Sequence, residues 1–177
     1  MYKKKYGRMT SAAWLNTELE HSSLFLTVFC GILVAVAYFV IRWVTGSPYR
    51  IMLELGIADI MPPVWLFSLL QLLGFLTVGC AAGLVLGWKD AGCAIDKYKG
   101  CLFFVLMAVV ELCWYPTLFG GGLVFLAVLE ALVMVCLAVC VAVCFFRISG
   151  LSGILISLHA VWLLYLMIFT CAVFFRN

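Results

Sequence analysis

The segment MPPVWLFSLLQLLGFLTVGCAAGLVLGW, residues Met61–Trp88, carries the clearest structural signal in the chain. It contains no charged side chain between Pro62-Pro63 and Trp88. At about 1.5 Å per residue, a helix of this length crosses a hydrocarbon layer about 30 Å thick. Proline is tolerated at a helix start, where the first amides have no partner within the helix. The segment therefore predicts a membrane-spanning helix that begins at a rigid double-proline corner.

The composition of the whole chain is that of an integral membrane protein. Of its 177 residues, 67% are hydrophobic and 11% are charged, and the mean hydropathy is +1.23. These values exclude a soluble globular domain. The basic N-terminus, with Lys3, Lys4, Lys5 and Arg8, suits anionic lipid headgroups better than nucleic acid. We therefore expect membrane lipids, and no nucleic acid, among the partners.

The hydropathy pattern predicts an all-α bundle of five transmembrane helices. A basic lead, residues 1–22, precedes one domain, residues 23–177. The expected spans are about 23–44, 62–88, 100–119, 123–146 and 153–175. In the lead, Thr10–Glu20 fits a short surface helix and a frayed tail equally well. The long connection Thr45–Met61 is expected to lie over the membrane surface or to cap a cavity.

The distribution of charge predicts the orientation. Five spans put the termini on opposite sides, and a cytoplasmic N-terminus places eight of the 11 Lys and Arg residues on the cytoplasmic side. The positive-inside rule therefore favours a cytoplasmic N-terminus. We expect the membrane to be a bacterial inner membrane.

The nine cysteines do not form the pattern of a disulfide framework, because most lie inside apolar runs. Cys136, Cys140 and Cys144 share a helix face, but packing explains them better than a metal does. No metal site is expected. The ladder Gly79, Gly83, Gly87 indicates close helix packing and does not require a dimer.

Two acidic residues lie inside predicted spans. Glu111 is in mid-span, three residues before Trp114, and Glu130 lies in the next span. An intramembrane carboxyl is costly and usually faces the bundle interior, where it is protonated or hydrogen-bonded. For Glu111 an interhelical hydrogen bond and a functional role are both open, whereas for Glu130 the hydrogen bond is favoured.

Other polar residues share helix faces with aromatic ones. Gln71 lies four residues before Phe75, and His159 lies three before Trp162. A lone histidine in a membrane helix is more often hydrogen-bonded than bound to a metal. The sequence shows no nucleophile paired with a base, no phosphate loop and no HExxH motif. Many rings and few polar groups suit a cavity for a flat, apolar ligand.

Three motifs in this chain resemble those of the TspO/MBR family, the tryptophan-rich sensory proteins or translocator proteins. PPVWLF at 62–67, followed by Gly79, is similar to the family's PPxWxF helix. VELCWYPTLFG at 110–120 is similar to LNxxWxPxFFG, and Trp162 and Asn177 fall where the last helix carries PYxxW and a closing Asn. The resemblance covers about residues 24–177 and implies a five-helix fold and a homodimer.

The chain departs from the family at positions that the resemblance places in the ligand pocket. Gln71 replaces a Trp, Phe75 a Tyr and Glu111 an Asn, and Leu158-His159 replaces the Pro-Tyr pair. The fold therefore carries over better than the ligand does. By the resemblance, Glu111 and His159 are polar anchors, Thr45–Met61 is a lid, and the pocket walls are Trp65, Phe67, Gln71, Phe75, Trp114 and Trp162.

The predicted function is a membrane receptor or sensor for a hydrophobic planar molecule, with transport left open. The resemblance implies a porphyrin or other tetrapyrrole, or a sterol-like lipid. Such a molecule would be a ligand, and no cofactor is required. Two alternatives are a porphyrin-degrading enzyme, which is less favoured than a binder, and a transporter or structural membrane protein with another ligand.

Overall fold

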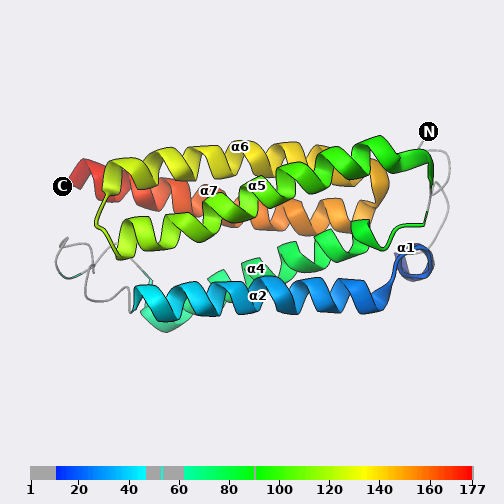
Figure 1. The fold of residues 1–177 in the computed structure, drawn as a ribbon, viewed down its shortest axis with the longest axis horizontal. Helices are drawn as coiled ribbons and strands as arrows, with labels where there is room; N and C mark the ends of the chain where they lie inside the picture. Colours follow the sequence, from blue (N-terminus) through cyan, green and yellow to red (C-terminus); the bar gives the residue numbers. More distant parts are fainter. Residues whose placement is uncertain (1–10, 47–52, 54–61, 90, 177) are drawn as a thin grey trace.

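The computed structural model describes residues 11–46, 53, 62–89 and 91–176. In this part of the chain a short helix precedes five long ones (Figure 1). Each long helix is long and apolar enough to cross a membrane, which confirms the predicted all-α, five-span class. The helices are α1 (Ser11–His21), α2 (Leu24–Thr45), α4 (Val64–Leu86), α5 (Ala94–Phe119), α6 (Val124–Ile148) and α7 (Gly150–Arg176), with a 3-10 turn η2 (Ala91–Cys93) before α5.

The five long helices pack as a closed ring. Going round it, α2 packs against α4, α4 against α7, α7 against α6, α6 against α5, and α5 against α2. As Figure 1 shows, α1 lies at the end of the bundle where α2 begins, and α7 ends at the opposite end. Side chains that point into the ring from α4, α5 and α7 can therefore meet in the membrane interior.

Two predicted helix boundaries are corrected by the structure. The helix of the third span begins at Ala94, not near residue 100. The polar segment 94–99 continues the helix beyond the apolar part, and Asp96 lies in the first turn, where the helix dipole favours an acid. The connection expected between the fourth and fifth spans, residues 147–152, shrinks to one residue, Ser149. Its extended backbone (φ −141°, ψ 126°) alone reverses the chain between α6 and α7.

The glycine ladder brings α2 onto the surface of α4. A Cβ atom at Gly83 would lie 2.5 Å from the carbonyl oxygen of Leu26 and 2.5 Å from the Cα atom of Thr27. At Gly79 it would lie 2.6 Å from the carbonyl oxygen of Cys30. The two backbones approach this closely because glycine has no side chain. The ladder is therefore an intrachain packing surface, as the packing interpretation predicted.

Aromatic side chains fill the centre of the ring. Phe75 from α4 stacks on Tyr38 from α2, with ring centroids 5.1 Å apart. Phe119 joins two other buried rings, because its centroid is 6.0 Å from that of Phe67 and 5.8 Å from that of Trp114. Contacts of this kind stabilise a core beyond the area that they bury. The interior beside the polar residues is thus filled by aromatic side chains in mutual contact.

A buried carboxyl fixes α1 to the bundle. Of the two descriptions left open for the N-terminal lead, the structure shows the helix over the described residues, Ser11–His21. Glu18 is fully buried, and its carboxyl accepts hydrogen bonds from the Ser149 hydroxyl and from the backbone N–H of Gly150. The first amides of a helix have no partner within it, so Glu18 caps α7 from a distant part of the sequence.

We expect Glu18→Ala to loosen this end of the molecule. The change leaves two buried donors, the Ser149 hydroxyl and the Gly150 N–H, without their acceptor, at a cost of about 1–3 kcal/mol. Thermal unfolding in detergent and limited proteolysis of the N-terminal lead would measure the effect. Glu20→Ala, on an exposed side chain of the same helix, is the control. Equal behaviour of the two variants would contradict the proposed capping role.

Candidate ligand-binding site

Four of the predicted site residues, drawn from three helices, form one hydrogen-bonded chain. The indole Nε1 of Trp162 donates to Oε1 of Gln71 over 2.8 Å. Nε2 of Gln71 donates to Oε1 of Glu111 over 3.2 Å. Oε2 of Glu111 lies 3.0 Å from Nε2 of His159. The chain links α4, α5 and α7 and returns to α7, so it ties one side of the ring together. We call these four residues the polar network.

Three of the four members of the polar network are buried. Gln71, Glu111 and His159 are each 1% exposed. A polar group in an apolar interior is tolerated only when it is hydrogen-bonded, and each of these three side chains has a partner in the network. The network therefore explains how an amide, a carboxyl and an imidazole are accommodated within one apolar bundle. It also supports the expectation that Glu111 is hydrogen-bonded inside the membrane.

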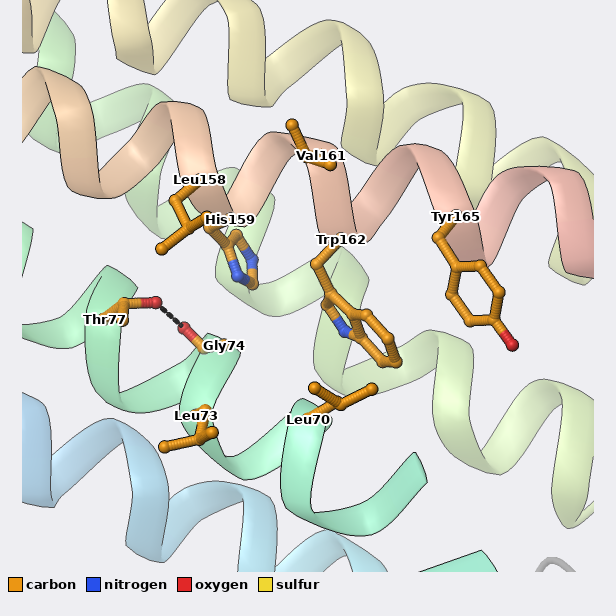
Figure 2. A pocket seen from close by; sticks show the side chains of 9 residues that line it. All are labelled: Leu70, Leu73, Gly74, Thr77, Leu158, His159, Val161, Trp162 and Tyr165. Carbon is orange, nitrogen blue, oxygen red and sulfur yellow. Dashed lines mark hydrogen bonds between the residues drawn. The ribbon is translucent and has the colours of Figure 1, made fainter. Parts of the chain in front are cut away.

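A lateral groove between α4 and α7 lies against the polar network. Its volume is about 320 Å³, and Figure 2 shows side chains of both helices around it. Trp162 and His159 belong to both the network and the groove, and the ring of Tyr165 stacks on that of Trp162 with centroids 5.0 Å apart. The groove is lined by Leu70, Leu73, Gly74, Thr77, Leu158, His159, Val161, Trp162 and Tyr165.

The second ring nitrogen of His159 has no hydrogen-bond partner within the described residues. This atom, Nδ1, faces the bare backbone of Gly74, because a Cβ atom there would lie 3.1 Å from it. Both residues line the groove. One buried polar atom beside the groove therefore lacks a hydrogen-bond partner among the described residues.

The other predicted wall residues take two different positions. Phe67, Phe75 and Trp114 are buried in the aromatic core, and the Phe67 ring also contacts that of Trp162 at 5.7 Å. Trp65 lies apart from them, in the first turn of α4, with 68% of its side chain exposed. This position suits a tryptophan at the membrane interface. The predicted lid, Thr45–Met61, falls almost entirely outside the described residues.

Several groove residues were not predicted. Gly74 lies three residues after Gln71, and Tyr165 lies three after Trp162, so each is on the helix face of a residue that was predicted. Helical spacing alone could have identified both. Leu70 and Leu73 carry no such signal, because their sequence resembles that of any lipid-facing surface.

The fold and the site together define an integral membrane protein: a five-helix bundle whose buried polar network borders a groove between two spans. A comparison with families of known proteins extends this description. The chain belongs to the TspO/MBR family, whose model matches residues 28–176. The match confirms the resemblance seen in the motifs, and membership supports a membrane sensor or receptor role. The comparison with curated proteins gives no match.

Proposed function

We propose that this protein is a membrane receptor that binds a hydrophobic planar molecule, a tetrapyrrole or a sterol-like lipid, in the groove between α4 and α7. The observation that carries the proposal is the juxtaposition of stacked rings and polar network at one groove. Trp162 and Tyr165 offer a flat aromatic surface. The network beside them supplies the few polar groups that orient a ligand in an otherwise apolar site.

The size of the groove supports a ligand that lies partly in the groove and partly among the lipid acyl chains. A volume of about 320 Å³ is at the lower end of the range for ligand sites, about 300–1,000 Å³. A tetrapyrrole or sterol would place one edge against Trp162 and leave the remainder among acyl chains. Leu158 and Val161, 62% and 65% exposed, form the rim that such a ligand would cross. Entry from the membrane then needs no opening of the helix ring.

We further propose a cytoplasmic N-terminus in a bacterial inner membrane. In support, Lys97 and Arg147 lie at the end of the bundle that carries α1, whereas Arg42 and Arg176 lie at the other end. A homodimer, which the family implies, would use a face other than the glycine ladder, because α2 occupies the ladder within the chain.

We expect Trp162→Ala to weaken protoporphyrin binding at least tenfold without unfolding the protein. Planar ligands gain much of their affinity from aromatic contact area. The substitution removes the indole ring that lies between the groove and Gln71. Titration of purified protein in detergent, followed by quenching of tryptophan fluorescence, would give the affinity. Trp43→Ala is the matched control, since that side chain is 88% exposed at the end of α2.

The same titration separates the proposal from its alternatives. Saturable binding by the wild type and by Trp43→Ala, but not by Trp162→Ala, supports a receptor with its site in this groove. If Trp162→Ala binds protoporphyrin with unchanged affinity, the ligand does not bind in this groove. Light-dependent loss of porphyrin absorbance would indicate a degrading enzyme, and ligand flux in proteoliposomes would indicate a transporter.

A further inference from the structure

The direction of each hydrogen bond in the polar network can be deduced from its donor-only end. An indole N–H donates and cannot accept, so the oxygen of the Gln71 amide must face Trp162. The amide NH₂ group then faces Glu111 and donates to Oε1. Oε1 is therefore an acceptor. The protonation of the network is decided entirely between Oε2 of Glu111 and the imidazole of His159.

A carboxyl hydrogen on Oε1 would have no acceptor among the contacts of the network, so it is set aside. Three other proton arrangements of the Glu111–His159 pair satisfy the 3.0 Å contact. In the first, a neutral carboxyl donates to Nε2, and the imidazole hydrogen is on Nδ1. In the second, a carboxylate faces an imidazolium, which carries hydrogens on both nitrogens. In the third, a carboxylate accepts from Nε2–H of a neutral imidazole, and Nδ1 is left as an acceptor. The first two arrangements are neutral overall, and the third has a net negative charge.

The apolar surroundings of the pair select between these arrangements. Both side chains are fully buried, and an uncompensated charge in such a place is costly. The structure shows no cation in contact with the pair among the described residues. The neutral arrangements are therefore favoured, and both of them place a hydrogen on Nδ1. The nitrogen at the groove is then a hydrogen-bond donor.

We propose that a ligand in the groove accepts a hydrogen bond from this N–H of His159, which is buried and unpartnered in the structure, so that His159 selects ligands that carry an acceptor oxygen, a carboxylate or a carbonyl, on an apolar body. The inference rests on the proposed function and extends it by naming the polar group of the ligand. Gly74 makes the contact possible, because a side chain there would crowd Nδ1 at 3.1 Å. Glu111 acts as a positioning residue, since it fixes which nitrogen of the imidazole carries the free hydrogen.

Three pyrene probes with the same apolar body test the inference. 1-Pyrenebutyric acid supplies an acceptor, 1-butylpyrene supplies no polar group, and 1-pyrenebutylamine supplies a donor. Binding to the full-length protein in detergent is followed by energy transfer from tryptophan to pyrene. The measured quantity is the affinity ratio of acid to alkyl probe in each variant, because comparison between variants cancels their different partition into micelles.

We expect the ratio of acid to alkyl affinity to fall about tenfold in His159→Phe, which keeps an aromatic ring and loses the donor. The double variant Glu111→Gln/His159→Phe should behave in the same way without leaving a buried carboxyl unpaired. Glu111→Gln alone should keep the wild-type ratio, because an amide that accepts from Gln71 donates to Nε2 and leaves the hydrogen on Nδ1. Gly74→Ala, which keeps the whole network, should also lower the ratio.

Each other outcome overturns the inference, and the outcomes are distinguishable. If the probes bind but the wild type and His159→Phe show the same ratio, the groove is a ligand site and His159 does not select for an acceptor. If the wild type prefers the amine, or if Glu111→Gln reverses the preference, Nδ1 is an acceptor. If no probe binds to the wild type, the proposed function in this groove fails and the inference fails with it.

Discussion

Gly83→Ala is expected to separate α2 from α4 and to destabilise the bundle by about 3 kcal/mol, near the upper end of the cost of overpacking a core. The added Cβ would lie 2.5 Å from two backbone atoms of α2, the Leu26 oxygen and the Thr27 Cα. Backbone atoms cannot move aside as a flexible side chain can, so the whole helix must shift. The free energy of unfolding, measured by SDS titration in mixed micelles, would show the loss.

The control for this prediction is the same substitution in an open place. At Gly121 a Cβ atom would meet its nearest neighbours at 3.4–3.6 Å, which is ordinary contact. Gly121→Ala should therefore be close to neutral, or slightly stabilising because it restricts the unfolded chain. A loss of stability no greater for Gly83→Ala than for Gly121→Ala would contradict the close packing of α2 on α4.

Breaking the Glu111–His159 contact is the second change with a large expected effect. Glu111→Leu or His159→Leu leaves buried polar groups of the network without a partner, at a cost of about 1–3 kcal/mol each. The double change to leucine removes both members, so its cost should be smaller than the sum of the single costs by about 0.5–3 kcal/mol. The free energies of unfolding of the four proteins, by the same titration, give this coupling.

A second cycle, between distant residues, is the control. His159→Leu combined with Glu18→Ala should be additive within about 0.3–0.5 kcal/mol, because Glu18 contacts the start of α7 and not the polar network. Additive behaviour of Glu111→Leu and His159→Leu would mean that the 3.0 Å contact makes no contribution of its own to stability.

Three of the positions at which this chain departs from the family's motifs lie together in the structure. Glu111 stands where the motif LNxxWxPxFFG has Asn, and His159 stands in place of Tyr. In the structure these two substitutions form one contact, and Gln71, a third departure, donates to the same carboxyl. The three departures therefore constitute one local change in chemistry, placed beside a groove that retains Trp162. This grouping is the reason for assigning the altered residues to ligand selection.

The sequence by itself determined the number and type of the spans. Long uncharged apolar runs have one stable solution in a membrane, because the backbone of each segment must satisfy its own hydrogen bonds. Helix length and the PPVWLF and Trp-Pro motifs were therefore sufficient for the fold class and the family. The residues of the polar network were also identified, since a buried Gln, Glu or His stands out among apolar neighbours.

Only the tertiary structure decided which of these residues meet and where a ligand can approach. Gln71 and Glu111 are 40 residues apart in sequence, and Glu18 and Ser149 are 131 apart, and spacing along one helix gives no information on such contacts. The same holds for Trp65 and Trp162, two similar tryptophans of which one is exposed and the other joins the network. In a membrane both lipid and protein interior are apolar, so hydrophobicity cannot tell the two faces of a helix apart. The packing of the ring makes that distinction.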